Sequence, residues 1–200
     1  DLFLTVDYYN IQVDDRISQS DKIELSQADK DTLEAAGVPN VQNLAQVSFF
    51  TNDFDTTTQG LDVVANYNAE LLDGDAVFSL AYNWNETTVD KFSDITGAFK
   101  VKRLEEDLPN HRATLTWAQS WDNVNAFTRV NYYGEYQGVH VDYDATAITA
   151  SSSFTIDAEV SYNFTDTLVL TVGAQNLLNK EAERINIPAA QGIPNNNWGG

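Results

Sequence analysis

The sequence predicts an all-β protein, an antiparallel up-and-down meander that forms part of a transmembrane β-barrel. Three observations support this fold class: strict polar–apolar alternation, the length of the alternating segments, and connections that are alternately long and short. A period of two is typical of a strand with one dry face and one wet face. A strand that crosses a bilayer needs roughly 9–11 residues, whereas a globular strand has about 5–6.

The clearest alternation runs from Ser153 to Phe164. Polar residues separate the apolar ones, which are Phe154, Ile156, Ala158, Val160, Tyr162 and Phe164. This segment is long enough to cross a bilayer, and its dry face ends in aromatic side chains. We therefore expect a transmembrane strand here.

Six other segments repeat this plan and bring the expected number of strands to about seven. They cover about 2–13, 60–72, 75–86, 111–121, 124–136 and 168–176. In the strand at 124–136, Phe127 and Tyr133 fall on the wet face, against the pattern. Six charged residues of these segments fall on wet faces: Asp7, Asp62, Glu70, Arg129, Asp157 and Glu159. A charge on a lipid face costs up to about 2–4 kcal/mol near the midplane, so the inverted assignment is disfavoured.

The connections alternate in length along the chain. Short turns at Asp73-Gly74, Asp122-Asn123 and 165–167 alternate with long polar segments at about 14–55, 87–109 and 137–152. A meander places alternate connections at opposite ends, so the short turns share one side and the long loops the other. Bacterial outer-membrane barrels have this asymmetry, with the long loops outside the cell.

One short helix is expected at about 27–36, within the first long loop. Ser26 and Asp29 form the pattern of a capping box, and Gly37 and Pro39 follow at positions typical of a helix end.

Composition narrows the function classes. The net charge of −19 disfavours nucleic acid as a partner, because binding its backbone needs a basic face. The chain has no Cys, so disulfides and thiolate metal sites are excluded. No run of 18 apolar residues exists, so no transmembrane helix is predicted. The chain lacks an initiator Met and a signal peptide, and we expect it to be a piece of a longer or processed protein.

No catalytic constellation is visible, and we expect neither an enzyme nor a cofactor. His140, Asp142 and Asp144 lie on one side of an extended segment and suit a metal ion, but a plain polar loop explains them better. Arg103 and Arg112 flank three acidic residues and predict an ion-pair network. The candidates for ligand contact in loops and lumen are Arg103, Arg129, Tyr136, His140, Asp142, Asp144 and Trp198.

Individual segments resemble the C-terminal half of the barrel of TonB-dependent outer-membrane receptors. The strongest match is Asp157–Phe164, a short turn, and then Leu168–Lys180, which ends in Asn-Leu-Leu-Asn-Lys. The other matching phrases, in the family's order, are Val6–Ile11, Asp15–Ile17, Thr58–Asp62 and Leu108–Arg112. Together they cover most of the chain.

The resemblance implies active uptake of a scarce nutrient across the bacterial outer membrane: siderophore-bound iron, vitamin B12, haem or a carbohydrate. It implies outer-membrane lipid and the TonB energy-coupling complex as partners, the latter through a plug domain outside this chain. A plugged barrel of this kind has about 22 strands. We therefore expect residues 1–200 to be a C-terminal portion of the barrel, without the plug and the final strand.

Two other classes remain open at this point. The first is a passive porin or adhesin barrel, which a plug and TonB box encoded upstream would exclude. The second is a soluble β-sandwich or carbohydrate-binding module, which would fold as a monomer without detergent.

Overall fold

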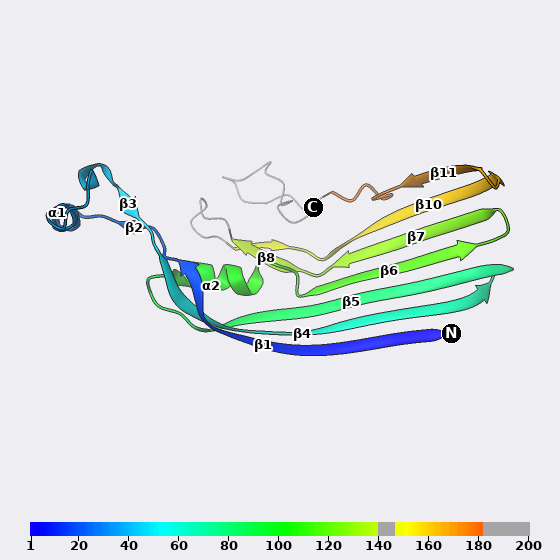
Figure 1. Ribbon diagram of the computed structural model, residues 1–200, viewed down its shortest axis with the longest axis horizontal. Helices are drawn as coiled ribbons and strands as arrows, with labels where there is room; N and C mark the ends of the chain where they lie inside the picture. The colour runs from blue at the N-terminus through cyan, green and yellow to red at the C-terminus, as the bar shows by residue number, and fades with distance from the viewer. Residues whose placement is uncertain (140–146, 182–200) are drawn as a thin grey trace.

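The computed structural model describes residues 1–139 and 147–181 and contains one large antiparallel sheet (Figure 1). Seven strands pair in the order β1-β4-β5-β6-β7-β10-β11, so neighbours in the sheet follow one another along the chain. These strands are β1 (Leu2–Gln19), β4 (Phe50–Leu71), β5 (Gly74–Lys91), β6 (His111–Ser120), β7 (Val124–Tyr133), β10 (Ser153–Thr165) and β11 (Leu168–Ala174). The predicted meander and its seven strands are confirmed, and the sheet is open between β1 and β11.

Two faces of opposite character follow from the strand register. One row of directly opposed residues runs across six strands and is wholly apolar: Leu4, Ala65, Leu80, Leu115, Val130 and Ile156. A row of the other face is mostly polar: Asp7, Asp62, Asn83, Arg112, Tyr133 and Ser153. We call these the apolar face and the polar face.

The sheet buries almost no hydrophobic core. Among the described residues only Val41, Phe54, Ala76 and Ala150 are buried hydrophobic side chains. On the apolar face, Leu4 is 56% exposed and Leu115 is 50% exposed. A contiguous exposed apolar surface of this extent marks contact with lipid or another apolar partner.

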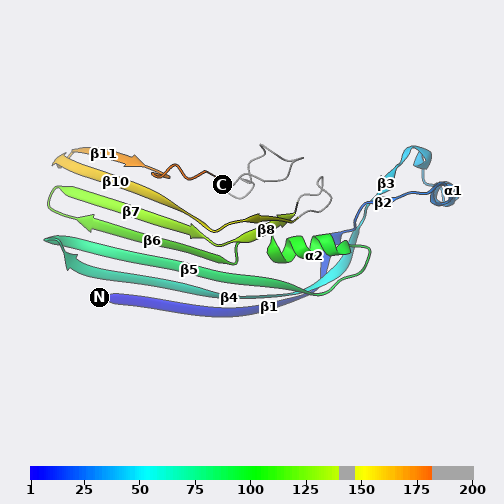
Figure 2. The same ribbon diagram turned by 180° about the vertical axis from the view of Figure 1, so that it is seen from behind.

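Three short turns lie together at one end of the sheet (Figures 1 and 2). The turn between β4 and β5 centres on Leu72 and Asp73, with φ of 53° and 59°, so it lies one residue before the predicted Asp73-Gly74. Gly74 instead starts β5, where a Cβ would lie 2.3 Å from the carbonyl oxygen of Ser120. Trp121 Nε1 donates to the Leu72 carbonyl at 2.8 Å and helps to hold the turn.

At the opposite end the strands continue beyond the expected limits. β1 reaches Gln19, β4 starts at Phe50 and β5 reaches Lys91, all inside segments predicted as loops. The period-two signal disappears there because Thr, Asp and Asn occupy both faces, yet the backbone ladder continues. β4 has 22 residues, about twice the length that crosses a bilayer.

The long connections contain further secondary structure. The first, residues 20–49, which we call the finger, holds β2 (Ile23–Glu24), α1 (Gln27–Ala35), η1 (Val41–Asn43) and β3 (Gln46–Val47). The second holds α2 (Gly97–Glu106), and the third holds the hairpin of β8 (Tyr136–Val139) and β9 (Ala147–Ala150). No helix in the described residues is long and apolar enough to cross a membrane.

The predicted helix at 27–36 is confirmed as α1. Ser26 accepts from the Asp29 backbone and Asp29 accepts from the Ser26 backbone, which completes the capping box. Gly37 follows with φ of 89°, as a helix end requires. α2 was not predicted, because it begins at Gly97 and Thr96 provides no side-chain cap.

Candidate functional site

The polar face carries a network of hydrogen bonds between neighbouring strands. Near the loop end, the ring of Tyr9 lies over Gly60, and Asn85 Nδ2 donates to the Tyr9 hydroxyl at 2.7 Å. Asn83 Nδ2 donates to Asp62 at 2.7 Å, and the hydroxyls of Thr58 and Thr87 lie 2.9 Å apart. Hydroxyl and amide groups therefore line this wall in fixed positions.

A second part of the network joins β7 to β10. Arg129 donates to Asp157 Oδ2 through Nη2 at 2.8 Å and Nε at 3.0 Å, and its guanidinium lies 5.8 Å from the Phe127 ring centroid. Asn131 Nδ2 donates to Thr155 at 3.2 Å. Phe127 thus has a partner on the polar face, which explains its position against the sequence pattern.

Phe127, Arg129 and Asp157 also line an open depression of about 350 Å³ that Glu159, Gly173 and Gln175 complete. The second oxygen of Asp157 accepts from the backbone N–H of Asn176 at 2.9 Å. Asn176 in turn exchanges two hydrogen bonds with the Lys180 backbone, at 2.8 and 3.0 Å. These contacts fold the chain back after β11 and give a structural reason for the Asn-Leu-Leu-Asn-Lys phrase.

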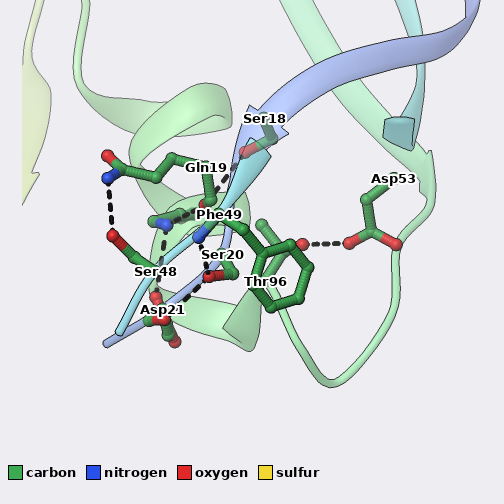
Figure 3. A network of polar contacts seen from close by, with 9 residues as sticks. Ser18, Gln19, Ser20, Asp21, Ser48, Phe49, Asp53 and Thr96 are labelled. Atoms are coloured by element: carbon green, nitrogen blue, oxygen red, sulfur yellow. Dashed lines mark hydrogen bonds and ion pairs between the residues drawn. The ribbon is translucent and has the colours of Figure 1, made fainter. Parts of the chain in front are cut away.

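At the loop end of the sheet, the base of the finger meets the connection between β5 and α2 (Figure 3). Thr96 is fully buried and donates to Asp53 Oδ2, and the backbone N–H of Ser93 donates to both Asp53 oxygens at 3.1 Å. Lys100 Nζ donates to the Gln19 carbonyl and lies 3.5 Å from Asp21 Oδ1. We call Gln19, Asp21, Asp53, Thr96 and Lys100 the junction.

The junction also contains backbone hydrogen bonds and a glycine, Gly97, that has no room for a side chain. The Asp21 N–H donates to the Ile95 carbonyl at 3.0 Å, and the Ser20 N–H donates to the Phe49 carbonyl at 2.8 Å. Gly97 has φ of 75°, and a Cβ there would lie 2.1 Å from Asp21 Oδ2. The hydroxyl of Thr96, and next the groups of Ser93, hold the pKa of Asp53 below its ordinary value, so the carboxylate stays ionised at neutral pH.

The structure distributes the predicted ligand contacts over separate elements. Arg129 lies on the polar face, Arg103 lies in α2 and Tyr136 begins β8. The remaining candidates, His140, Asp142, Asp144 and Trp198, lie outside the described residues. Among the residues that the structure describes, no group of three His, Cys, Asp or Glu side chains is placed to hold a metal ion.

The predicted ion-pair network around Arg103 and Arg112 is only half right. Arg103 Nε pairs with Asp107 at 2.9 Å, and Lys102 pairs with Glu106 at 3.6 Å, both within α2. Glu105 instead accepts from the Val89 N–H at 2.8 Å. Arg112 belongs to β6 and shares the polar face with Asn83 and Tyr133, so the strand that begins after α2 carries it away from the acidic residues.

The sequence did not reveal the junction. Asp53 and Thr96 are 43 residues apart, and Lys100 and Gln19 are 81 apart. Their contacts depend on the register of β1, β4 and β5 beyond the alternating segments. No local pattern marks these residues, whereas the wet-face assignment placed both Arg129 and Asp157 on the polar face.

Comparisons with known proteins agree with the geometry. The family model described as TonB dependent receptor-like, beta-barrel, matches residues 1–177. The solved "Structure of the FpvAI-pyocin S2 complex" contains a chain similar to this one, with a TM-score of 0.55 and 13% sequence identity. The match covers 90% of this chain and 21% of that chain, so this chain spans about a fifth of its length. No curated protein matches the sequence.

Proposed function

We propose a function from one established point: the chain belongs to the TonB-dependent receptor β-barrel family. The protein that contains it is an outer-membrane receptor that imports a scarce nutrient, and these residues supply barrel strands and external loops. The nutrient is siderophore-bound iron, vitamin B12, haem or a carbohydrate. Residues 1–200 form a C-terminal portion of the barrel, and the protein is a transporter without enzymatic activity.

The observation that carries this proposal is the two-faced, uncovered sheet. Its apolar face is continuous across six strands and exposed, whereas its polar face holds hydrogen-bonded Asn, Thr, Tyr and Asp side chains. In lipid, a backbone must satisfy its hydrogen bonds internally, which long antiparallel ladders do except at the edges. The edges β1 and β11 therefore pair with further strands of the same barrel.

The arrangement of the connections sets the orientation of the barrel. The three short turns lie at one end, with the finger, α2 and the β8–β9 hairpin at the other (Figures 1 and 2). In outer-membrane barrels short turns face the periplasm and long loops the medium. The polar face then lines the lumen, where ligand contacts and a plug would lie, and the TonB complex acts on that plug from the periplasm.

Two alternative classes, a soluble β-sandwich and a passive barrel, can be separated from this proposal. An observation disfavours the first, and an experiment tests the second. A soluble β-sandwich needs a second sheet over the apolar face, and the described residues contain only two small two-stranded sheets besides the large one. A passive porin or adhesin barrel shares the lipid-facing sheet. Import by a mutant that lacks TonB separates that class from an energised receptor, because only the energised receptor loses uptake.

Single cysteines in the full-length protein test the orientation. We expect Cys at Glu34, Asp94 or Ser152 to react with a membrane-impermeant maleimide on intact cells. Matched cysteines at Asp73, Asp122 or Asp166, in the short turns, should react only after the outer membrane is permeabilised. No reaction at all three loop positions would contradict the proposed topology.

A further inference from the structure

We infer that Asp53, Thr96 and Lys100 are positioning residues that clamp α2 across the loop end of the polar face and couple it to the finger. α2 contacts β5 and β8, which approach it from opposite sides of the sheet's concave end (Figures 1 and 2). Under the proposed function this end is the outer mouth of the barrel. α2 then sets the size of the solutes that reach the polar face.

Burial at this end of the sheet shows that the polar face is covered there. Phe54 is 4% exposed and Thr56 is 2% exposed, and both have the polar-face parity of β4. Farther along the same face, Asn66 is only half-buried and Asn68 is exposed. Thr96 is fully buried and donates to Asp53, the neighbour of Phe54 in β4, so the connection that leads into α2 lies against this same end of β4.

α2 depends on contacts with neighbouring elements for its position. It has ten residues, and an isolated helix of that length is marginal in water. Ion pairs of Lys102 with Glu106 and of Arg103 with Asp107 join residues one turn apart near its C-terminal end. The Val89 N–H donates to Glu105 at 2.8 Å and ties α2 to β5, and α2 also lies against β8.

The junction joins three segments at once. Asp53 belongs to β4, Thr96 precedes α2 and Lys100 lies within it, and Gln19 and Asp21 belong to the end of β1 and the start of the finger. The hydroxyl of Thr96 has no access to water and loses its partner if Asp53 moves. A displacement of the finger base is therefore transmitted to Lys100 and from there to α2.

Hydrogen–deuterium exchange on the purified full-length receptor tests the clamp. In Thr96→Val, we expect exchange of the amides in 98–106 to rise about tenfold, the equivalent of one lost buried hydrogen bond, with 113–120 in β6 unchanged. Lys100→Met should give a smaller rise in the same peptide. Thr57→Val is the matched control, since it removes a Thr–Asp bond of 2.6 Å, to Asp90, that joins β4 to β5 and includes no residue of α2 or of the junction.

The outcomes separate the parts of this inference. An unchanged α2 peptide in both variants, or an equal rise throughout β4–β6, would overturn the clamp. A rise in Thr96→Val alone would overturn the coupling to the finger. The matched control should leave the α2 peptide at its wild-type rate, and a rise there would also count against the clamp.

A second measurement tests whether α2 limits the size of the solutes that enter the barrel mouth. Of the two measurements, only this one rests on the proposed function. Ala81 is exposed on the polar face, and Ala81→Cys reports access through the mouth on intact cells. Thr96→Val should raise the labelling rate for a polyethylene-glycol maleimide relative to a small impermeant maleimide. An unchanged ratio, or no labelling by either reagent, would overturn the role of α2 in size selection. If the loop cysteines at Glu34, Asp94 and Ser152 also failed to react, the proposed topology itself would be at fault.

Discussion

The sheet and the finger belong to one chain but are stabilised in different ways. The sheet is held by backbone ladders that continue across seven strands, while its apolar side chains stay uncovered. The finger has two-residue strands, a helix α1 without a buried residue, and one fully buried hydrophobic side chain, Val41. Stability of the sheet therefore depends on the surrounding lipid, and that of the finger on a few local side-chain contacts.

Local contacts in the finger centre on Gln42. Its Nε2 donates to Glu34 at 2.7 Å, its Oε1 accepts from Gln27 at 2.9 Å, and its carbonyl accepts from Lys30 at 3.4 Å. α1 has nine residues, too few for stability alone in water. Side-chain hydrogen bonds from one residue thus replace the packing that a larger domain would supply.

The largest expected effect comes from a charge on the apolar face. Leu115→Lys places an ammonium in the middle of the apolar row and should destabilise the full-length barrel in lipid by about 2–4 kcal/mol. Thr116→Lys, one residue along on the polar face, should cost much less. Urea titration of the receptor folded into vesicles measures both, and equal losses would erase the distinction between the two faces.

A smaller loss of stability is expected at Gly60, where the neighbouring strands leave no room for a side chain. A Cβ at Gly60 would lie 2.3 Å from the Tyr9 ring and 2.6 Å from the Trp84 carbonyl, so Gly60→Ala should cost about 1–3 kcal/mol. Adding Tyr9→Ala should recover part of this loss, because only the backbone clash remains. The same vesicle titration, carried out on the single and double variants, gives the comparison. No recovery would show that Tyr9 does not shape this site.

In the finger, we expect the loss of a helix cap to destabilise α1 without affecting the sheet. Ser26→Ala removes the cap of α1 and should destabilise the helix by about 1 kcal/mol. Hydrogen exchange should rise in 27–35 and stay unchanged in β4 and β5. A change in the global unfolding midpoint would contradict the view that α1 is stabilised by local contacts alone.

The smallest effect concerns pH at the junction. Hydrogen bonds from Thr96 and Ser93 lower the pKa of Asp53 below 3.8, so the contribution of this carboxylate is complete above that value and is lost as pH falls through the lowered pKa. A nitroxide on Ala98→Cys should keep its mobility between pH 7 and 5 and gain it only in stronger acid. In an Asp53→Asn background the acid-induced gain should vanish; its persistence would assign the transition to another group.

The same contrast explains what the sequence could predict. The strand from Ser153 to Phe164 was located to within a residue because lipid on one side and water on the other impose the period of two. The capping box of α1 is likewise a local signal. The outer halves of β4 and β5 carry polar residues on both faces, and the junction depends on contacts between distant residues, so neither left a pattern. Ligand contact by His140, Asp142, Asp144 and Trp198 stays a prediction, as it does for Arg103, Arg129 and Tyr136.

The most direct test of the central claim compares two neighbouring residues of β6 in the full-length receptor in vesicles. Nitroxides at Leu115 and Thr116 are exposed in turn to oxygen, which concentrates in lipid, and to a water-soluble nickel complex. We predict that the Leu115 label collides mainly with oxygen and that the Thr116 label does not. A Leu115 label that collides freely with the nickel complex would contradict the lipid-facing sheet and the receptor assignment that rests on it.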